Sequence, residues 1–332
     1  MMDRTSLGLL GMQEDLLKAL VATGTPVIVV LLNVRDPSTV AAVSVKISGL
    51  KSVGDAMVAQ GGQVATEPWM ASSAALIEAH YPGQEGGRAL ADLLFDANGA
   101  GSTGWGRLVY SFYTSQAVMP PHTSMAFAGA GRTYRYSRDD GRALSFRFGD
   151  GLTYTNFSYS APAVLVNGEA ASSARPCQNV SVEVTVRNSG PHPGVEAVQV
   201  YLAGANSTDP RVAAAHVRAL AAFARTRVLA PGETQRLRIP VPHQALSVVV
   251  VTDPTTKLAP GTLSNASRVL EAPRRFVVSV GGSQPRPAGV EWARRSSAGE
   301  NAAAFTLPGF AGATVHGMPL GLVGDSTPLA MC

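Results

Sequence analysis

Two runs of alternating apolar residues in the second half of the chain restrict its fold most strongly. The first run is Val180, Val182, Val184 and Val186, and the second is Val198, Val200 and Leu202. The residues between them are mostly polar, and a period of two is that of a β-strand with one buried face. Glycine- and proline-containing turns at 188–194 and 230–234 separate these runs from the next apolar segments. Short strands joined by such turns predict an all-β sandwich over residues 151–282.

The first half of the chain follows a different pattern, in which helical and extended segments alternate. Residues 12–22 place apolar side chains at helical spacing and predict an amphipathic helix. Residues 27–32 form a continuous run of Val, Ile and Leu, typical of a parallel strand that is covered on both faces. A second apolar stretch occupies 74–79, and a helix is predicted over 85–95. The alternation predicts an α/β sheet domain over residues 1–150.

The last fifty residues, 283–332, are rich in Pro, Gly and Ala and show little periodicity. Such a composition cannot bury much apolar surface, so we expect a loosely packed or disordered tail.

Charge and hydropathy argue against several classes of function. The 332-residue chain has a formal net charge of +4, but its basic residues are scattered and do not alternate with aromatics, which argues against nucleic-acid binding. No apolar segment reaches the roughly 18 residues of a transmembrane helix, so no membrane span is expected. The first residues lack a basic region followed by an apolar core, and we therefore expect no signal peptide.

We expect neither a metal site nor a cofactor. The two cysteines, Cys177 and Cys332, lie far apart without metal-ligand spacing, and their pairing stays open. The six histidines also fall in no ligand spacing. A glycine-rich segment at 99–104 lacks the lysine of a phosphate-binding loop.

Short motifs follow one another along the chain in a recognisable order. Two linked segments are the most informative, namely Gly131-Arg132-Thr133-Tyr134-Arg135-Tyr136 and Phe146-Arg147-Phe148-Gly149-Asp150-Gly151-Leu152-Thr153-Tyr154-Thr155-Asn156-Phe157. Further motifs lie at 3–4, 10–13, 26–32, 81–87, 91–95 and 106–108, and then at 184–194, 196–201, 220–223 and 229–233. In this order they resemble the C-terminal portion of family 3 glycoside hydrolases of the β-xylosidase and α-arabinofuranosidase type.

The resemblance implies a partial α/β sandwich domain over 1–150, followed by a fibronectin type III-like sandwich over 151–282. It also implies hydrolysis of β-glycosidic bonds with retention, which needs a nucleophilic carboxylate and a carboxylic acid/base about 5 Å apart. In the family the nucleophile comes from an N-terminal barrel, and the acid/base lies shortly before the segment that matches Asp3-Arg4. We therefore expect no catalytic residue in this chain and no turnover by the chain alone.

The resemblance further implies that the loop at 81–87 belongs to the domain that helps to frame the sugar pocket. The candidate pocket-framing residues are Tyr81, Pro82, Gly83, Gln84 and Glu85. A structural role is the favoured alternative, because the Pro-Gly-Gln sequence suits a tight strand-to-helix turn and a carboxylate suits a helix N-terminus. Asp139 and Asp140 are adjacent turn residues, and a solvated turn is favoured over a catalytic pair.

Residues 34–60 depart from the family pattern, which continues directly from the strand ending at Asn33 into the segment at 61–64. The segment 34–60 holds two of the chain's four lysines. We predict that it is an insert from an unspliced intron, and a genuine surface insertion is the alternative.

Four Asn-x-Ser/Thr triplets occur in the second half, at Asn156, Asn179, Asn206 and Asn265. They are N-glycosylation candidates, and together they favour a parent protein that enters the secretory pathway and acts outside the cell.

The sequence therefore predicts the C-terminal part of a retaining glycosidase that acts on xylan-derived oligosaccharides. Its expected partners are an oligosaccharide or polysaccharide, met through the parent enzyme, and the N-terminal barrel domain. The alternative is a non-catalytic fibronectin type III-like module for binding or scaffolding. Few exposed aromatics are expected on the sandwich, since Tyr201 and Phe223 occupy alternating or core-like positions.

Overall fold

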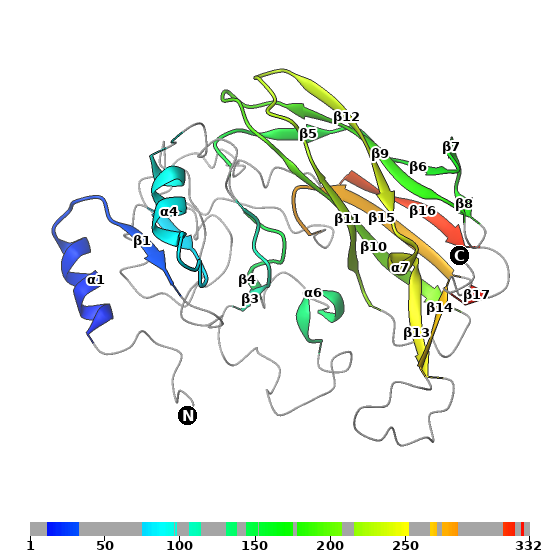
Figure 1. Ribbon diagram of the computed structural model, residues 1–332, viewed down its shortest axis with the longest axis horizontal. Coiled ribbons are helices and arrows are strands. Elements are labelled where there is room, and N and C mark those ends of the chain that lie inside the picture. Colours follow the sequence, from blue (N-terminus) through cyan, green and yellow to red (C-terminus); the bar gives the residue numbers. More distant parts are fainter. Residues whose placement is uncertain are drawn as a thin grey trace, which may run out of the picture.

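The computed structural model describes residues 12–32, 75–95, 97, 106–113, 131–137, 144–151, 153–174, 178–207, 216–251, 266–270, 274–284, 315–322 and 327–328. An α/β part lies at one end of the molecule and a β-sandwich at the other (Figure 1). The predicted insert 34–60 lies outside the described residues, as do both cysteines, Asp139 and Asp140.

Within the described residues, the α/β part contains two helices and two strands, α1 (Gln13–Ala22), β1 (Ile28–Leu31), β2 (Ala75–Glu78) and α4 (Gly86–Leu94). β1 and β2 pair in parallel, with Ile28 opposite Ala75 and Leu31 opposite Glu78. These elements confirm the predicted alternation of helix and parallel strand, with boundaries within one or two residues of those expected.

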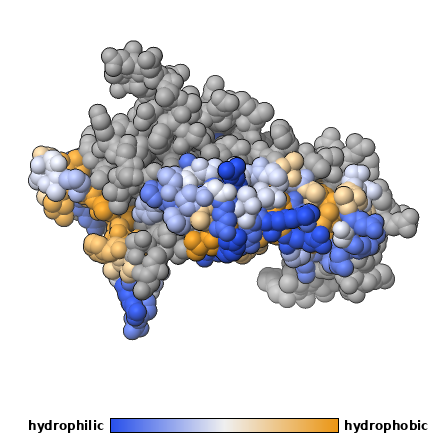
Figure 2. Space-filling model, turned by 90° about the horizontal axis from the view of Figure 1, so that it is seen from above, coloured by the Kyte–Doolittle hydropathy of each residue, from blue (hydrophilic) through white to orange (hydrophobic). Residues whose placement is uncertain are grey.

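The burial of these elements differs from the expectation. The apolar stripe of α1 lies at the surface, where Met12 is 74% and Leu16 60% exposed. In β1 the side chains of Val29 and Leu31 are buried, but Ile28 is 41% exposed, so the strand is not covered on both faces. In Figure 2, hydrophobic residues accordingly appear at the end of the molecule that carries α1 and β1. Periodicity predicts which side of an element is apolar, but a neighbouring layer is needed to cover it.

Three short elements lie between the α/β part and the sandwich, namely β3 (Phe112–Tyr113), α6 (Thr133–Tyr136) and β4 (Leu144–Phe146). β3 and β4 form an antiparallel pair, in which Phe112 lies opposite Phe146. Figure 1 shows all three between α4 and the long strands of the sandwich.

In the part of the chain that the structure describes, the sandwich has two five-stranded sheets. One sheet has the order β11 (Ala219–Arg225), β10 (Ala197–Ser207), β15 (Arg274–Gly281), β16 (Val315–Leu322) and β8 (Ser173–Ala174). The other has the order β12 (Thr234–Val241), β9 (Val180–Asn188), β6 (Ala163–Val166) and β7 (Glu169–Ala170), with β5 (Phe157–Tyr159) also paired to β9. The short helix α7 (His243–Leu246) leads into a separate sheet of β13 (Ser247–Val251), β14 (Ala266–Leu270) and β17 (Thr327–Pro328).

The inward faces of the two sheets form the main core. The alternating residues of β9 are all buried, and Val182 and Val186 are fully inaccessible to solvent. They pack in one cluster with Val198 and Val200 of β10 and with Phe276, Val278 and Val280 of β15. Each side chain of this size contributes about 1.5–3 kcal/mol when it is fully buried. The alternation in the sequence therefore predicted the inner faces of both sheets correctly.

The expected tail requires a correction at β16 and β17. β16 pairs antiparallel with β15, where Phe276 lies opposite Leu320 and Val278 opposite Met318, and it pairs in parallel with β8. A disordered segment over all of 283–332 is therefore wrong for Val315–Leu322, which forms an inner strand of a sheet. The strand arises from the ladder that β15 offers, which a weak local pattern does not reveal.

Candidate functional site

The loop at 81–85 follows the carboxyl end of β2 and leads directly into α4. In open parallel sheets, ligands bind at this end of the strands, which makes the loop the candidate functional site. All five predicted residues are solvent-exposed, and Tyr81 is 72% exposed. The structure thus brings the five residues together at one surface turn.

The turn has a specific steric design. Gly83 has a φ of +73°, and its carbonyl oxygen accepts a hydrogen bond from the Gly86 amide at 3.2 Å. A Cβ atom on Gly86 would overlap the ring of Pro82, since it would lie 2.7 Å from the Pro82 Cβ. The proline ring therefore covers the first residue of α4, and only glycine fits there. This close approach explains why the two residues occur together.

A half-buried polar cluster lies next to this loop, and the sequence did not predict it. The Glu78 side chain, 2% exposed, accepts a hydrogen bond from the His80 amide at 3.0 Å and lies 3.3 Å from His80 Nδ1. The Tyr110 hydroxyl lies 3.1 Å from the same Nδ1. The available signal was a glutamate at the end of an apolar strand, directly before the motif.

Burial changes the acidity of this cluster. Burial raises the pKa of the Glu78 carboxyl to about 7, and the hydrogen bond from the His80 amide opposes the shift. Burial also lowers the pKa of the His80 imidazole. Both shifts favour the neutral forms, as expected for polar groups shielded from water.

Asp92 of α4 forms an exposed i,i+4 contact with Arg88 at 4.0 Å, which is a surface interaction of little energetic weight. No group of three or more His, Cys, Asp or Glu residues suited to a metal ion occurs in the described ranges. Within those ranges, no helix is long and apolar enough to cross a membrane.

The glycosylation candidates are spread over the sandwich. Asn179 is exposed directly before β9, and Asn156 is half-buried directly before β5. Asn206 lies in β10, although its side chain is outside the described part, and Asn265 lies outside it altogether.

The informative motifs of the sequence meet at the junction between the α/β part and the sandwich. Arg107 donates hydrogen bonds from Nη2 to both carboxylate oxygens of Glu196 at 2.9 Å, and from Nη1 to the Gly151 carbonyl at 2.7 Å. The Tyr159 hydroxyl donates to Glu196 Oε1 at 2.9 Å. Burial raises the pKa of the Glu196 carboxyl, while Arg107 and the Tyr159 hydrogen bond oppose the shift.

A second set of contacts closes the same junction. The amide nitrogen Nε2 of Gln199 donates to the carbonyls of Gly149 and Gly282, at 3.2 and 2.9 Å. Gly149 has a φ of +81°, and a Cβ there would lie 2.7 Å from the Tyr201 hydroxyl. The glycine-containing turn of the motif is therefore fitted against Gln199 and Tyr201, on the face of β10 that points away from the core.

The short helix α6 completes the junction. The Tyr134 ring stacks on Phe148 at 4.0 Å between ring centroids, and its hydroxyl accepts a hydrogen bond from the Leu220 amide at 3.2 Å. The Arg135 carbonyl accepts from the amides of Val217 and Arg218. These contacts attach α6 to the start of β11 and to the two residues directly before that strand.

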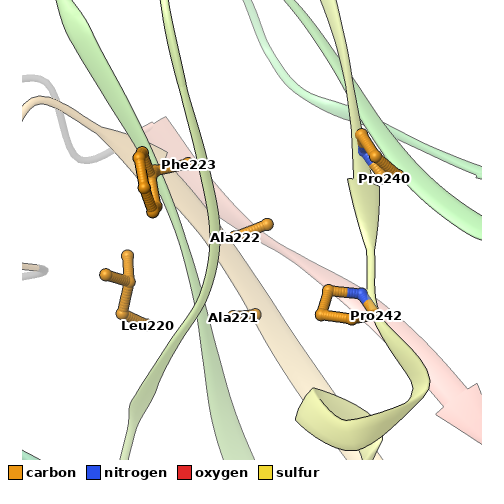
Figure 3. A pocket seen from close by; sticks show the side chains of 6 residues that line it. All are labelled: Leu220, Ala221, Ala222, Phe223, Pro240 and Pro242. Carbon is orange, nitrogen blue, oxygen red and sulfur yellow. The ribbon is translucent and has the colours of Figure 1, made fainter.

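A shallow apolar hollow of about 460 Å³ lies on the sandwich between β11 and β12 (Figure 3). Its lining residues are Leu220, Ala221, Ala222, Phe223, Pro240 and Pro242. Phe223 is 69% exposed, whereas Tyr201 is buried at 1%. The expected core-like position of Phe223 is therefore wrong, because β11 is an edge strand whose outer side chains face solvent.

Two matches to protein families agree with these two parts of the chain. Residues 45–154 match the glycosyl hydrolase family 3 C-terminal domain, and residues 196–284 match the fibronectin type III-like domain. The first match begins inside the segment 34–60, whose predicted origin as an insert stays a prediction.

Individual relatives are glycosidases. The chain is 32% identical over 259 residues to a xylan 1,4-beta-xylosidase of Xylanibacter ruminicola, which covers 78% of this chain and 24% of the relative. It is 32% identical over 201 residues to a probable beta-glucosidase H of Neosartorya fischeri, covering 58% of this chain and 22% of the relative. The chain thus spans about a quarter of the length of these relatives.

Solved structures of glycosidases likewise match most of this chain but only about a third of their own length. DesR, a beta-glucosidase from Streptomyces venezuelae solved with D-glucose, superposes with a TM-score of 0.54 at 26% identity and covers 85% of this chain and 30% of that chain. The exo-beta-xylosidase XlnD gives a TM-score of 0.57 over 99% of this chain and 35% of that chain, and at 19% identity it shows the fold alone. The chain belongs to glycoside hydrolase family 3, and it corresponds to the C-terminal portion of such an enzyme.

Proposed function

We propose that the protein to which this chain belongs hydrolyses β-O-glycosidic bonds with retention, on xylan-derived oligosaccharides or related β-glycosides. The carrying observation is the adjacent pair of family matches, which together follow the order of a family 3 glycosidase. Similarity to a xylan 1,4-beta-xylosidase supports the xylan substrate, and similarity to beta-glucosidases keeps glucosides as the competing class.

The role of this chain in that enzyme is to frame and support the sugar site. The exposed loop at 81–85 sits at the carboxyl end of a parallel strand, where a bound sugar would be expected. The buried junction around Arg107 and Glu196 fixes the α/β part on the sandwich. Positioning of this kind supports catalysis without supplying the reacting carboxylates.

Turnover should then need the nucleophilic and acid/base carboxylates that the family resemblance assigns to the parent enzyme outside this chain. We expect no hydrolysis of an aryl β-xyloside by this chain alone, and restored hydrolysis when the family's barrel portion is added. Robust hydrolysis by the chain alone, lost on changing one of its own carboxylates, would contradict the proposal. Comparing an aryl β-xyloside with an aryl β-glucoside on the restored enzyme distinguishes the two substrate classes.

A secreted location is part of the same proposal. The exposed Asn179, followed by Val180 and Ser181, is the best placed of the four glycosylation candidates. We expect expression through a eukaryotic secretory pathway to add a glycan at Asn179 that Asn179→Gln removes. A mass unchanged by glycosidase treatment would count against this site.

A non-catalytic binding module is the second candidate, and the exposed Phe223 in its apolar hollow favours it. The test is retention of the full chain on insoluble xylan. If the sandwich binds polysaccharide, Phe223→Ser should abolish retention, while the control Val228→Ser, at a residue 47% exposed, should not. Equal weak retention of all three proteins would favour the supporting role.

A further inference from the structure

Glu78, His80 and Tyr110 form a compact set of titratable groups outside the junction. Glu78 ends β2, His80 lies two residues later, and Tyr110 comes from the segment that precedes β3. The ring centroids of His80 and Tyr110 are 5.3 Å apart with a tilt of 60°. Glu78 and Tyr110, which are 32 positions apart in the sequence, thus both contact the His80 ring.

The Glu78 carboxylate holds both the backbone and the ring of His80. The same oxygen, Oε1, accepts the His80 amide at 3.0 Å and lies 3.3 Å from Nδ1. His80 has a φ of +52°, a left-handed conformation that is uncommon for residues other than glycine. The backbone hydrogen bond therefore stabilises the turn that directs the chain into the loop at 81–85.

The Nδ1 atom of His80 lies near both Glu78 and the Tyr110 hydroxyl, and these two partners favour different positions of the ring hydrogen. A Tyr110 hydroxyl that donates to Nδ1 needs this nitrogen as an acceptor, which places the ring hydrogen on Nε2. An ionised Glu78 carboxylate can only accept, which favours the hydrogen on Nδ1. A protonated Glu78 can itself donate to Nδ1, and then the ring hydrogen returns to Nε2.

The described neighbours of the cluster include one apolar strand and one helix. The register partner of Glu78 is Leu31 of the apolar strand β1. On α4, the charged residues Arg88 and Asp92 interact with each other on an exposed face. Among the described contacts of His80, the titratable partners are Glu78 and Tyr110. Burial favours the neutral carboxyl of Glu78 and the neutral imidazole of His80. The position of the single ring hydrogen of His80 therefore depends on its hydrogen bonds with Glu78 and Tyr110.

We propose that Glu78, His80 and Tyr110 form a positioning cluster in which the proton on Glu78 selects the tautomer of His80. With Glu78 protonated, His80 carries its hydrogen on Nε2 and offers a donor beside the loop at 81–85. With Glu78 ionised, the hydrogen moves to Nδ1 and Nε2 becomes an acceptor. The His80 side chain is 32% exposed, so a hydroxylated ligand or water can reach the ring.

The change of His80 tautomer is called the switch below. Only its use in binding rests on the proposed function, because His80 Nε2 would hydrogen-bond a sugar hydroxyl at the candidate site. The switch itself is a property of this chain and can be measured without any turnover. Failure of the glycosidase assay and failure of the switch are therefore separate results.

The test is a pH titration of the full chain by nitrogen-15 NMR of the histidine rings. Because the two ring nitrogens of a neutral imidazole have very different shifts, each tautomer is identified directly. We expect the His80 nitrogens to exchange their roles with a midpoint near pH 7, and the His80 amide proton to shift with the same midpoint. In Glu78→Gln both transitions should disappear, whereas in Glu85→Gln, an exposed carboxylate of the same loop, both should remain.

Three outcomes would overturn the proposal. One is a single His80 tautomer on both sides of pH 7 in the unmodified chain. Another is a transition that persists in Glu78→Gln. The third is formation of an imidazolium, with both nitrogens at the charged-form shift, in place of a tautomer exchange. The first and third need no variant, so the proposal stays testable even if Glu78→Gln does not fold.

Discussion

At the scale of single residues, the Arg107–Glu196 ion pair is buried and can be compared with an ion pair at the surface. The two side chains are only 11% and 1% exposed, whereas Arg227 and Glu233 form a surface pair that is 54% and 36% exposed. Removing one partner of a buried pair leaves the other charge unpaired, which costs about 3–5 kcal/mol. We expect Arg107→Gln to lower the free energy of unfolding by about this amount.

The matched control is Arg227→Gln, which makes the same chemical change at the surface. Exposed pairs contribute about 0–1 kcal/mol, so this variant should be close to the unmodified chain in urea unfolding. Equal losses for the two variants would show that burial of the Arg107 pair does not decide its energetic effect.

Glu78 makes a prediction about pH. Its pKa is near 7 in the folded chain and returns to the ordinary value near 4.5 on unfolding. Between these values the folded chain binds more protons than the unfolded chain, so stability falls as the pH rises from about 4.5 to 7. We expect the protection factors of the β2 amides, which correct for the base-catalysed rise of intrinsic exchange with pH, to fall over this range and to lose that dependence in Glu78→Gln. An unchanged pH dependence in the variant would assign the effect to another group.

At the scale of elements, the start of α4 depends on one glycine. Since a Cβ at Gly86 would overlap the Pro82 ring, we expect Gly86→Ala to destabilise the chain by about 1–3 kcal/mol, as for other overpacked sites. Its neighbour Gly87 has open space around the Cβ position and lies within the helix. Gly87→Ala should therefore stabilise the chain by up to about 1 kcal/mol. Thermal unfolding of both variants is the measurement, and shifts of the same sign would contradict the steric argument.

Elements with a strong local period were predictable from the sequence, and those created by tertiary pairing were not. The valines of β9 and the apolar run of β1 carry their own pattern, so both strands were predicted close to their boundaries. β16 has only a short alternation, at Met318, Leu320 and Leu322, within a segment rich in Pro, Gly and Ala, and it depends on the ladder of β15. The contact between His80 and Tyr110 likewise joins positions 30 residues apart, which no local pattern can reveal.

β16 leads to a prediction of its own. A chain ending at residue 284 would expose the edge of β15 that now pairs with β16. We expect amides of β15 to exchange faster in this truncated chain, while those of β9 in the opposite sheet change little. Identical exchange at β15 in the two chains would mean that β16 does not protect it in solution.

At the scale of the whole molecule, the two parts differ in how well they bury their apolar surface. The sandwich encloses a continuous core, with Val182, Val198 and Val278 fully buried. The α/β part leaves Leu16 of α1 and Leu32 after β1 each 60% exposed. Less burial means a smaller free energy of local unfolding, so the molecule should not be uniformly stable.

Limited proteolysis tests this difference directly. Because proteases cut chains that open locally, we expect early cleavage before residue 107 and a resistant fragment that contains the sandwich and the junction around Glu196.

Adding the family's barrel portion should slow the early cleavage if that portion covers the apolar surface of α1. Replacing Leu16 with Glu should leave the stability of the chain alone within about 0.5 kcal/mol, as for other exposed positions, but should abolish that protection. Early loss of the sandwich with survival of residues 12–95 would reverse the assigned order of stability.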